Sequence, residues 1–182
     1  MSLFAHKIHE DSSDEFGTPP EFVRPISEAV GGFDLDPAAG AERKPLASTR
    51  FTQEDDGLTQ EWFGTVWLNP PFSEKTRWVR KARAEVADGN VGTAVVLLPV
   101  DTSTQLFHTH VTDAAAVCFV EGRLSFDGGD DNPNFGVLLA VFGETSDELL
   151  DALDRKGSVF QIDEKHERAE QQELFVDGGG SA

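Results

Sequence analysis

Short apolar runs alternate with helical patterns along most of this chain, and that alternation limits the folds open to it more than any other feature. Strand-like runs lie at 33–36, 65–68, 93–98 and 116–120, and helical patterns lie at 19–30, 74–87 and 103–111. The run at 93–98 has the continuous apolar character of a strand that is covered on both faces. Strands and helices in this order predict an α/β fold with a mainly parallel sheet.

The last third of the chain predicts an antiparallel addition to that sheet. A Gly- and Asp-rich loop at 126–133 separates the strand-like segments 123–125 and 136–142, which we expect to pair as a hairpin at the edge of the sheet. A helix to about residue 155 and an edge strand at 158–162 follow. Residues 1–16 lack periodicity, and 163–182 are charged and then Gly-rich. We therefore predict one domain at 17–162 between a mobile arm and a flexible tail.

Two segments carry the sequence pattern of a helix start. In Thr18-Pro19-Pro20-Glu21, the threonine can cap the helix, the glutamate completes a capping box, and a proline suits the first helical position. The segment Thr145-Ser146-Asp147-Glu148 predicts a second capping box before the helix that ends near residue 155.

The chain is strongly acidic, with 33 acidic and 15 basic residues and a formal net charge of -18. The acidity is spread along the chain and resembles that of proteins from salt-loving archaea, which stay soluble through excess negative charge. At about 1 M salt the Debye length is near 3 Å, so this acidity does not exclude a nucleic-acid partner. No stretch approaches the roughly 20 apolar residues of a membrane span, and we expect a soluble, cytoplasmic protein without a membrane partner.

The single cysteine and two neighbouring histidines raise the question of a nucleophile or a metal site. Cys118 lies in an apolar run, so we interpret it as a small buried hydrophobic residue. His108 and His110 have no Cys or acidic residue at ligand spacing, and we read them as helix residues and predict no metal site.

The segment Asn69-Pro70-Pro71-Phe72 follows the strand at 65–68 directly and carries the chemistry that we find most informative. Methylation of an exocyclic amine requires two fixed hydrogen-bond acceptors, because the lone pair of the nitrogen is delocalised into the ring. The side-chain oxygen of Asn69 and the carbonyl of Pro70 can be those acceptors, Pro71 stiffens the backbone, and Phe72 can stack on a base. The alternative is a turn that ends a strand and places Phe72 in the core.

The order of several short motifs, and not this tetrapeptide alone, resembles the phage-type DNA N-6-adenine methyltransferases, the small Dam-like enzymes of viruses and prophages. The matching motifs are Thr18-Pro19, 33–39, 56–58, 66–72, 78–79, 81–82, 97–99, 107–108 and 122–126. The resemblance implies a Rossmann-like methyltransferase sheet, S-adenosylmethionine as the cofactor, and DNA as the partner, with the adenine flipped out of the duplex. An RNA amine, a glutamine side chain, or a catalytically inactive DNA-binding relative are the alternatives.

The resemblance also implies cofactor contacts at Asp34, Asp36, Pro37 and Ala38, at Thr18 and Pro19 near the methionine end, and at Asp56 for the ribose or adenine. Local bonding offers another explanation for two of them, because Thr18 can cap a helix and Asp36 can cap a turn. The chain departs from larger methyltransferases in two respects. Ala41-Glu42 replaces a second glycine after Gly40, and only 32 residues lie between Asp36 and Asn69. The chain has no room for a separate target-recognition domain.

DNA contacts must then come from helices and loops. Five of the 15 basic residues fall within nine positions of the helix at 74–87, namely Lys75, Arg77, Arg80, Lys81 and Arg83. We predict that Lys75, Arg77, Arg80 and Lys81, together with Arg123, bind DNA phosphates. The alternative is a solvated helix face whose charge is balanced by Glu74 and Glu85.

Overall fold

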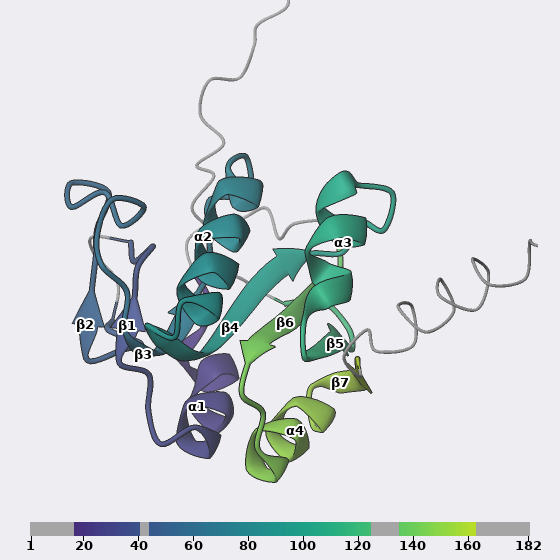
Figure 1. Ribbon diagram of the computed structural model, residues 1–182. Helices are drawn as coiled ribbons and strands as arrows, with labels where there is room; N and C mark the ends of the chain where they lie inside the picture. Colours follow the sequence, from purple (N-terminus) through teal and green to yellow (C-terminus); the bar gives the residue numbers. More distant parts are fainter. Residues whose placement is uncertain (1–16, 41–43, 125–134, 163–182) are drawn as a thin grey trace, which may run out of the picture.

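A single mixed sheet of seven strands forms the centre of the structure (Figure 1), a computed structural model that describes residues 17–40, 44–124 and 135–162. The strand order is β2-β1-β3-β4-β6-β5-β7. The bounds are β1 (Leu35–Asp36), β2 (Thr49–Arg50), β3 (Gly64–Leu68), β4 (Val91–Pro99), β5 (Ala116–Val120), β6 (Val137–Gly143) and β7 (Gly157–Gln161). The predicted arm at 1–16 and tail at 163–182 lie outside the described residues.

The pairs from β2 to β4 are parallel, and the pairs from β4 to β7 are antiparallel. Since β6 is antiparallel to both β4 and β5, the strands β1 to β5 all run in one direction, and β6 and β7 run in the other. The predicted α/β fold, with a mostly parallel sheet of the Rossmann-like methyltransferase type and antiparallel strands, is confirmed.

The hairpin differs from its prediction in detail. The antiparallel partner of β6 is β5, residues 123–124 are not in a strand, and Ser125 lies outside the described residues. Moreover, β6 lies inside the sheet between β4 and β5, and its first six residues are buried. Such a continuous apolar strand is typical of one that is covered on both faces, and its place between β4 and β5 also pairs its backbone on both sides.

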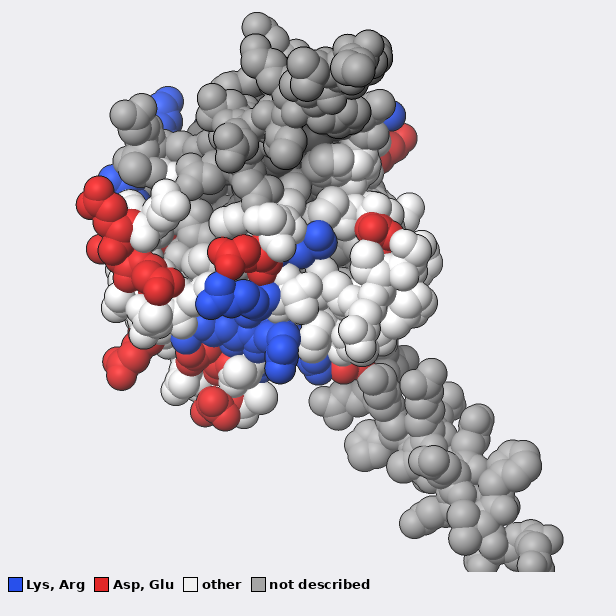
Figure 2. All heavy atoms as spheres, turned by 90° about the horizontal axis from the view of Figure 1, so that it is seen from above, with Lys and Arg blue, Asp and Glu red and all other residues white. Residues whose placement is uncertain are grey.

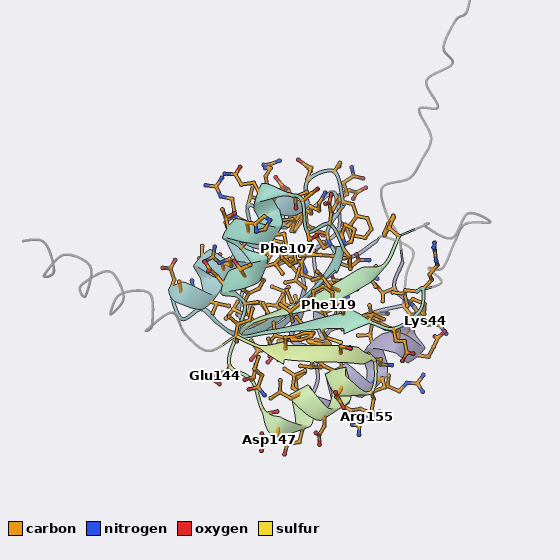
Figure 3. The ribbon with its side chains drawn as sticks, turned by 90° about the vertical axis from the view of Figure 1, so that its right-hand side faces the viewer. Lys44, Phe107, Phe119, Glu144, Asp147 and Arg155 are labelled. Atoms are coloured by element: carbon orange, nitrogen blue, oxygen red, sulfur yellow. The ribbon has the colours of Figure 1, made fainter. Side chains whose placement is uncertain are left out.

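Helices cover both faces of the sheet and give three layers. On one face lie α2 (Lys75–Ala87), α3 (Gln105–Thr109) and the 3-10 helix η1 (Val111–Asp113), and on the other face lie α1 (Pro20–Ala29) and α4 (Asp147–Asp154). Figure 3 shows the sheet nearly edge-on, with Phe107 of α3 above it and Asp147 and Arg155, at the two ends of α4, below it. None of the described helices is both long enough and apolar enough to cross a membrane.

The central strand β4 joins the two hydrophobic cores. Val95 and Leu97 pack into the core beneath α1 and α4, while Val96 and Leu98 pack into the core beneath α2 and α3. All four are at most 1% exposed, and full burial of each such side chain contributes roughly 1.5–3 kcal/mol. The alternation along this strand therefore fixes both layers of helices on one rigid sheet.

The two predicted capping boxes have different outcomes. The N-cap residue of α1 is Pro19, which has no side-chain cap, so the prediction that Thr18 caps this helix is wrong. At α4 the cap is made, but by Ser146 and not by Thr145; its Oγ accepts a hydrogen bond from the backbone N–H of Leu149 at 3.2 Å.

Candidate active site

A cavity of ≈ 850 Å³ lies at the carboxyl ends of β1 and β3. Five segments contribute to its lining: the start of α1, the turn after β1, the chain around β2, the turn at 56–58, and the Asn69 segment with the first turn of α2. Its volume falls in the range of roughly 300–1,000 Å³ typical of small-molecule sites. The carboxyl ends of parallel strands are the usual ligand position in open α/β sheets. The predicted site residues that line it are Thr18, Asp36, Pro37, Ala38, Asp56, Asn69, Pro70, Pro71 and Arg77.

Asp36 is the buried carboxylate of this cavity, with 7% of its surface exposed. Its Oδ1 accepts a hydrogen bond from the backbone N–H of Ala38 at 3.2 Å, so it does cap the turn after β1. Backbone bonds between Asp36 and Phe51, and between Ala39 and Phe51, tie this turn to the chain that follows β2. Asp36 thus shapes the turn and at the same time lines the cavity.

The opposite wall is built around Gly57, which belongs to the matching motif at 56–58 but had no predicted role. A Cβ at this position would lie 2.0 Å from the carbonyl oxygen of Pro37, so only glycine allows the wall to approach the β1 turn. The indole Nε1 of Trp62 donates a hydrogen bond to the Gly57 carbonyl at 2.8 Å, and Trp62 stacks on Trp78 of α2 with ring centroids 6.2 Å apart. The Asp56-Gly57 pair, typical of tight turns, is the sequence signal that could have located this wall.

Asn69 follows β3 directly and is held by a residue far away in the sequence. Its Nδ2 donates a hydrogen bond to Thr18 Oγ1 at 3.1 Å, and Thr18 is 7% exposed. Thr18 makes this contact in place of the predicted helix cap.

The backbone after Asn69 is fixed by the start of α2. The backbone N–H of Glu74 donates to the carbonyl of Pro71 at 3.1 Å, and Lys75 Nζ donates to the carbonyl of Phe72 at 2.9 Å. The two prolines already limit rotation of this backbone. The carbonyl of Pro70 therefore lies in a segment with little freedom to turn.

Three of the predicted catalytic and cofactor-binding residues are not among those that line the cavity. Phe72 is 9% exposed and packs edge-on against Phe135, with ring centroids 5.6 Å apart. Pro19 is the N-cap residue of α1. Asp34 Oδ2 accepts a hydrogen bond from the backbone N–H of Thr65 at 2.8 Å, which joins the start of β1 to β3. These residues therefore support the elements around the cavity and do not line it.

Two of the basic residues on α2 are half-buried and held by neighbouring side chains. Lys81 pairs with Glu85 at 2.7 Å, and its ammonium group lies 5.3 Å from the centre of the Trp62 ring. Arg83 pairs with Asp113 at 2.7 Å and so anchors α2 to η1. These two cations fix α2 against its neighbours.

The other basic residues of α2 lie near the motif or on the surface. Arg77 lines the cavity, forms an ion pair with Glu74, and has a 67% exposed side chain, while Arg80 is exposed one turn further along α2. Arg123 is also exposed. Figure 2 shows basic side chains gathered in one patch on the face seen from above, with acidic side chains beside it.

Neither His108 and His110 nor Cys118 is among the residues that line the cavity. Arg83 donates a hydrogen bond to His110 Nδ1, and burial together with the positive charges of Arg83 and Arg80 lowers the pKa of His110. Burial raises the pKa of the Cys118 thiol to about 11, and its Sγ donates to the carbonyl of Leu153 at 3.3 Å. The interpretation of Cys118 as a buried residue is confirmed. Within the described ranges, no three His, Cys, Asp or Glu side chains form a group that could hold a metal ion.

Comparison with known proteins identifies the family. The model of the family "DNA N-6-adenine-methyltransferase (Dam)" matches residues 5–173. The DNA N-6-adenine-methyltransferase of Escherichia phage T1 is 32% identical over 167 residues, which are 90% of this chain and 68% of the phage protein. No solved structure gives a significant match. The motifs, the sheet and these matches agree, and the chain belongs to the Dam family of DNA N-6-adenine methyltransferases.

Proposed function

We propose that this protein transfers a methyl group from S-adenosylmethionine to the N-6 exocyclic amine of adenine in DNA. The observation that carries the proposal is the position of Asn69-Pro70-Pro71 on the rim of a cavity at the carboxyl ends of two parallel strands. Membership of the Dam family supports adenine in DNA as the substrate.

The residues of the motif hold the amine for reaction. Asn69 Oδ1 and the carbonyl of Pro70 accept its two hydrogens and turn its lone pair out of conjugation with the ring. These acceptors are fixed before the substrate arrives, because Thr18 holds the Asn69 amide and the start of α2 holds the backbone after Pro70. Phe72, whose ring is held by Phe135, remains our candidate for stacking on the flipped base.

The cavity fits S-adenosylmethionine in size and in chemistry. It offers the buried carboxylate of Asp36 as an acceptor for hydroxyl or ammonium groups, and the apolar surfaces of Leu58 and Trp78 for an aromatic ring. Thr18, Pro37, Ala38 and Asp56 complete the proposed contacts. The bound cofactor would supply an electrophilic methyl group on a sulfonium ion.

The test is methylation of DNA by the protein and by Asn69→Ala. We expect wild type to produce N-6-methyladenine, measured by mass spectrometry and by digestion with methylation-sensitive nucleases. Loss of one preorganised acceptor lowers kcat by about 10²–10³-fold or more, while calorimetry still detects cofactor binding. Asn90→Ala is the matched control, because Asn90 bonds only to Glu85 at the exposed end of α2. Equal activity of Asn69→Ala and wild type would remove Asn69 from the site.

For the contact with DNA, the exposed cations Arg77, Arg80 and Arg123 are our main candidates, because Lys81 and Arg83 are half-buried and pair with Glu85 and Asp113. Arg80→Ala should weaken DNA binding and reduce the slope of log affinity against log salt by about 1. Arg83→Ala should lower thermal stability instead, through loss of its bond to Asp113. The same loss of DNA affinity in both variants would contradict this division of roles.

The same assays separate the alternatives. RNA and a glutamine-containing peptide offered in place of DNA test the other amine substrates, and cofactor binding without methylation of any of them would identify an inactive relative. Because the net charge of -18 suggests adaptation to high salt, each assay is run from low to molar KCl.

A further inference from the structure

We propose that Thr18 is a positioning residue that sets the orientation of the Asn69 side-chain amide. This inference rests on the proposed function, because it concerns how Asn69 presents its oxygen to the adenine amine. It adds a role to Thr18 that neither helix capping nor cofactor contact describes.

The contact between Thr18 and Asn69 is a tertiary one. The residues are 51 positions apart, and Oγ1 of the buried Thr18 accepts from Nδ2 at 3.1 Å. The start of α1, where Thr18 was expected to act, has no side-chain cap at all. The hydroxyl is therefore directed to the end of β3 and not to its own helix.

The direction of this hydrogen bond determines what Asn69 can do. A side-chain amide has two donor hydrogens on nitrogen and an acceptor oxygen on the opposite side. With Nδ2 held by Thr18, Oδ1 is the atom that is turned away from Thr18 and can accept from an amine. If the amide were rotated by half a turn, its N–H groups would face the N–H groups of adenine. The hydrogen bond from adenine to Asn69 Oδ1 could then not form.

The second bond of the hydroxyl favours the productive orientation. Among the described residues, no acceptor pairs with the proton of Thr18 itself, and Thr18 lines the cavity. An acceptor atom of a bound cofactor can take this proton, which leaves the lone pairs of Oγ1 for Asn69 Nδ2. The same hydroxyl then contacts the cofactor and orients the amide.

Thr18→Val tests the proposal, because it keeps the shape of the side chain and removes the hydroxyl. We expect kcat, measured at saturating cofactor and DNA, to fall by about 10- to 100-fold, the scale of a misplaced reacting group. Thr18→Ser, which keeps the hydroxyl, should restore most of the activity. A hydroxyl that only binds cofactor would raise KM and leave kcat unchanged, and that result would overturn the proposal.

Two further measurements do not depend on catalysis. The Nδ2 protons of Asn69, assigned by comparison with Asn69→Ala, should exchange slowly with solvent in wild type and faster in Thr18→Val. The thermal stability losses of Thr18→Val and Asn69→Ala should not add in the double variant, because each removes the same hydrogen bond. Unchanged exchange or full additivity would contradict the role of Thr18.

Thr93→Val is the matched control. Thr93 is 9% exposed, and its hydroxyl donates to the carbonyl of Glu144 at 2.8 Å near the start of β4, away from the residues that line the cavity. Thr93→Val should lose stability with no change in kcat.

The two proposals can fail separately. If wild type methylates adenine and Thr18→Val does so at the wild-type rate, only the positioning role fails. If wild type binds cofactor but does not methylate DNA, the proposed function fails instead.

Discussion

The starts of α1 and α4 carry almost the same sequence pattern and use it differently. At α4 the hydroxyl is used locally: Ser146, one residue after the predicted Thr145, caps the helix by accepting from the backbone N–H of Leu149. At α1, the hydroxyl of Thr18 bonds to Asn69, 51 residues away. The difference follows the position in the fold, because the start of α1 lines the cavity and the residues at the start of α4 do not.

The prolines explain how α1 dispenses with a side-chain cap. A helix start normally leaves several backbone N–H groups without partners, and a cap satisfies one of them. Neither Pro19 nor Pro20 has an N–H group, and the N–H of Phe22 bonds to the carbonyl of Pro19 at 3.0 Å. The start of α1 therefore needs fewer acceptors, and Thr18 is available for the site.

Two glycines allow the same comparison between a position at the cavity and one away from it. Their substitution should give the largest losses of unfolding free energy. A Cβ would lie 2.0 Å from the Pro37 carbonyl oxygen at Gly57, and 2.1 Å from the Gly92 carbonyl oxygen at Gly143. Gly57→Ala and Gly143→Ala should each destabilise the protein by about 1–3 kcal/mol or more in denaturant unfolding. Only Gly57→Ala should also weaken cofactor binding in calorimetry, because only Gly57 lines the cavity. A similar loss of binding in both variants would show that the wall has no local role.

Substitutions at the two helix starts should have smaller effects on stability. Ser146→Ala should cost about 1 kcal/mol of unfolding free energy, the usual value of a helix cap, with kcat unchanged. Thr145→Ala, the exposed neighbour predicted as the cap, should change neither quantity. Thr18→Val should do the opposite of Ser146→Ala: it should lower kcat strongly and the free energy of unfolding only slightly. A Ser146→Ala variant with reduced kcat would break the distinction between the two helix starts.

Local sequence pattern is sufficient for elements such as β3, β4 and α2, because each buries a face whose periodicity is visible in a short window. The place of the Asn69 segment directly after β3 was also predictable, because the segment follows an apolar run without a break. The position of β6 between β4 and β5 was not, because strand order depends on packing between distant segments.

The same limit applies to single residues whose surroundings are set by distant segments. Thr18, Lys81 and Arg83 were read from their neighbours in sequence, yet each is fixed by a tertiary contact: Thr18 by Asn69, Lys81 by Trp62 and Arg83 by Asp113. The Arg83–Asp113 pair spans 30 residues. A helix with five basic residues therefore predicted one cationic surface, whereas the structure separates exposed cations from those that anchor the helix.

The smallest expected effect concerns a polar contact that is remote from both helix starts, the bond from Arg83 to His110 Nδ1. A guanidinium group can only donate, so Nδ1 must be unprotonated to accept. Burial and the charges of Arg83 and Arg80 lower the pKa of His110 below 6.5, against a smaller opposing effect of Asp113. The unfolded chain therefore takes up this proton at a higher pH, and stability falls as the pH drops below about 6.5 towards the pKa of the folded state.

His110→Gln isolates this contribution, because its amide oxygen can still accept from Arg83 and the side chain does not titrate. Between about pH 7.5 and pH 5.5, the melting temperature of wild type should fall more than that of His110→Gln, while carboxylates elsewhere affect both proteins alike. His108→Gln is the control substitution, because His108 is an exposed histidine of α3, two residues before His110, and makes no contact with Arg83. Parallel curves for wild type and His110→Gln would mean that the contact between α2 and α3 survives protonation, and that it supports the fold through packing and not through the hydrogen bond.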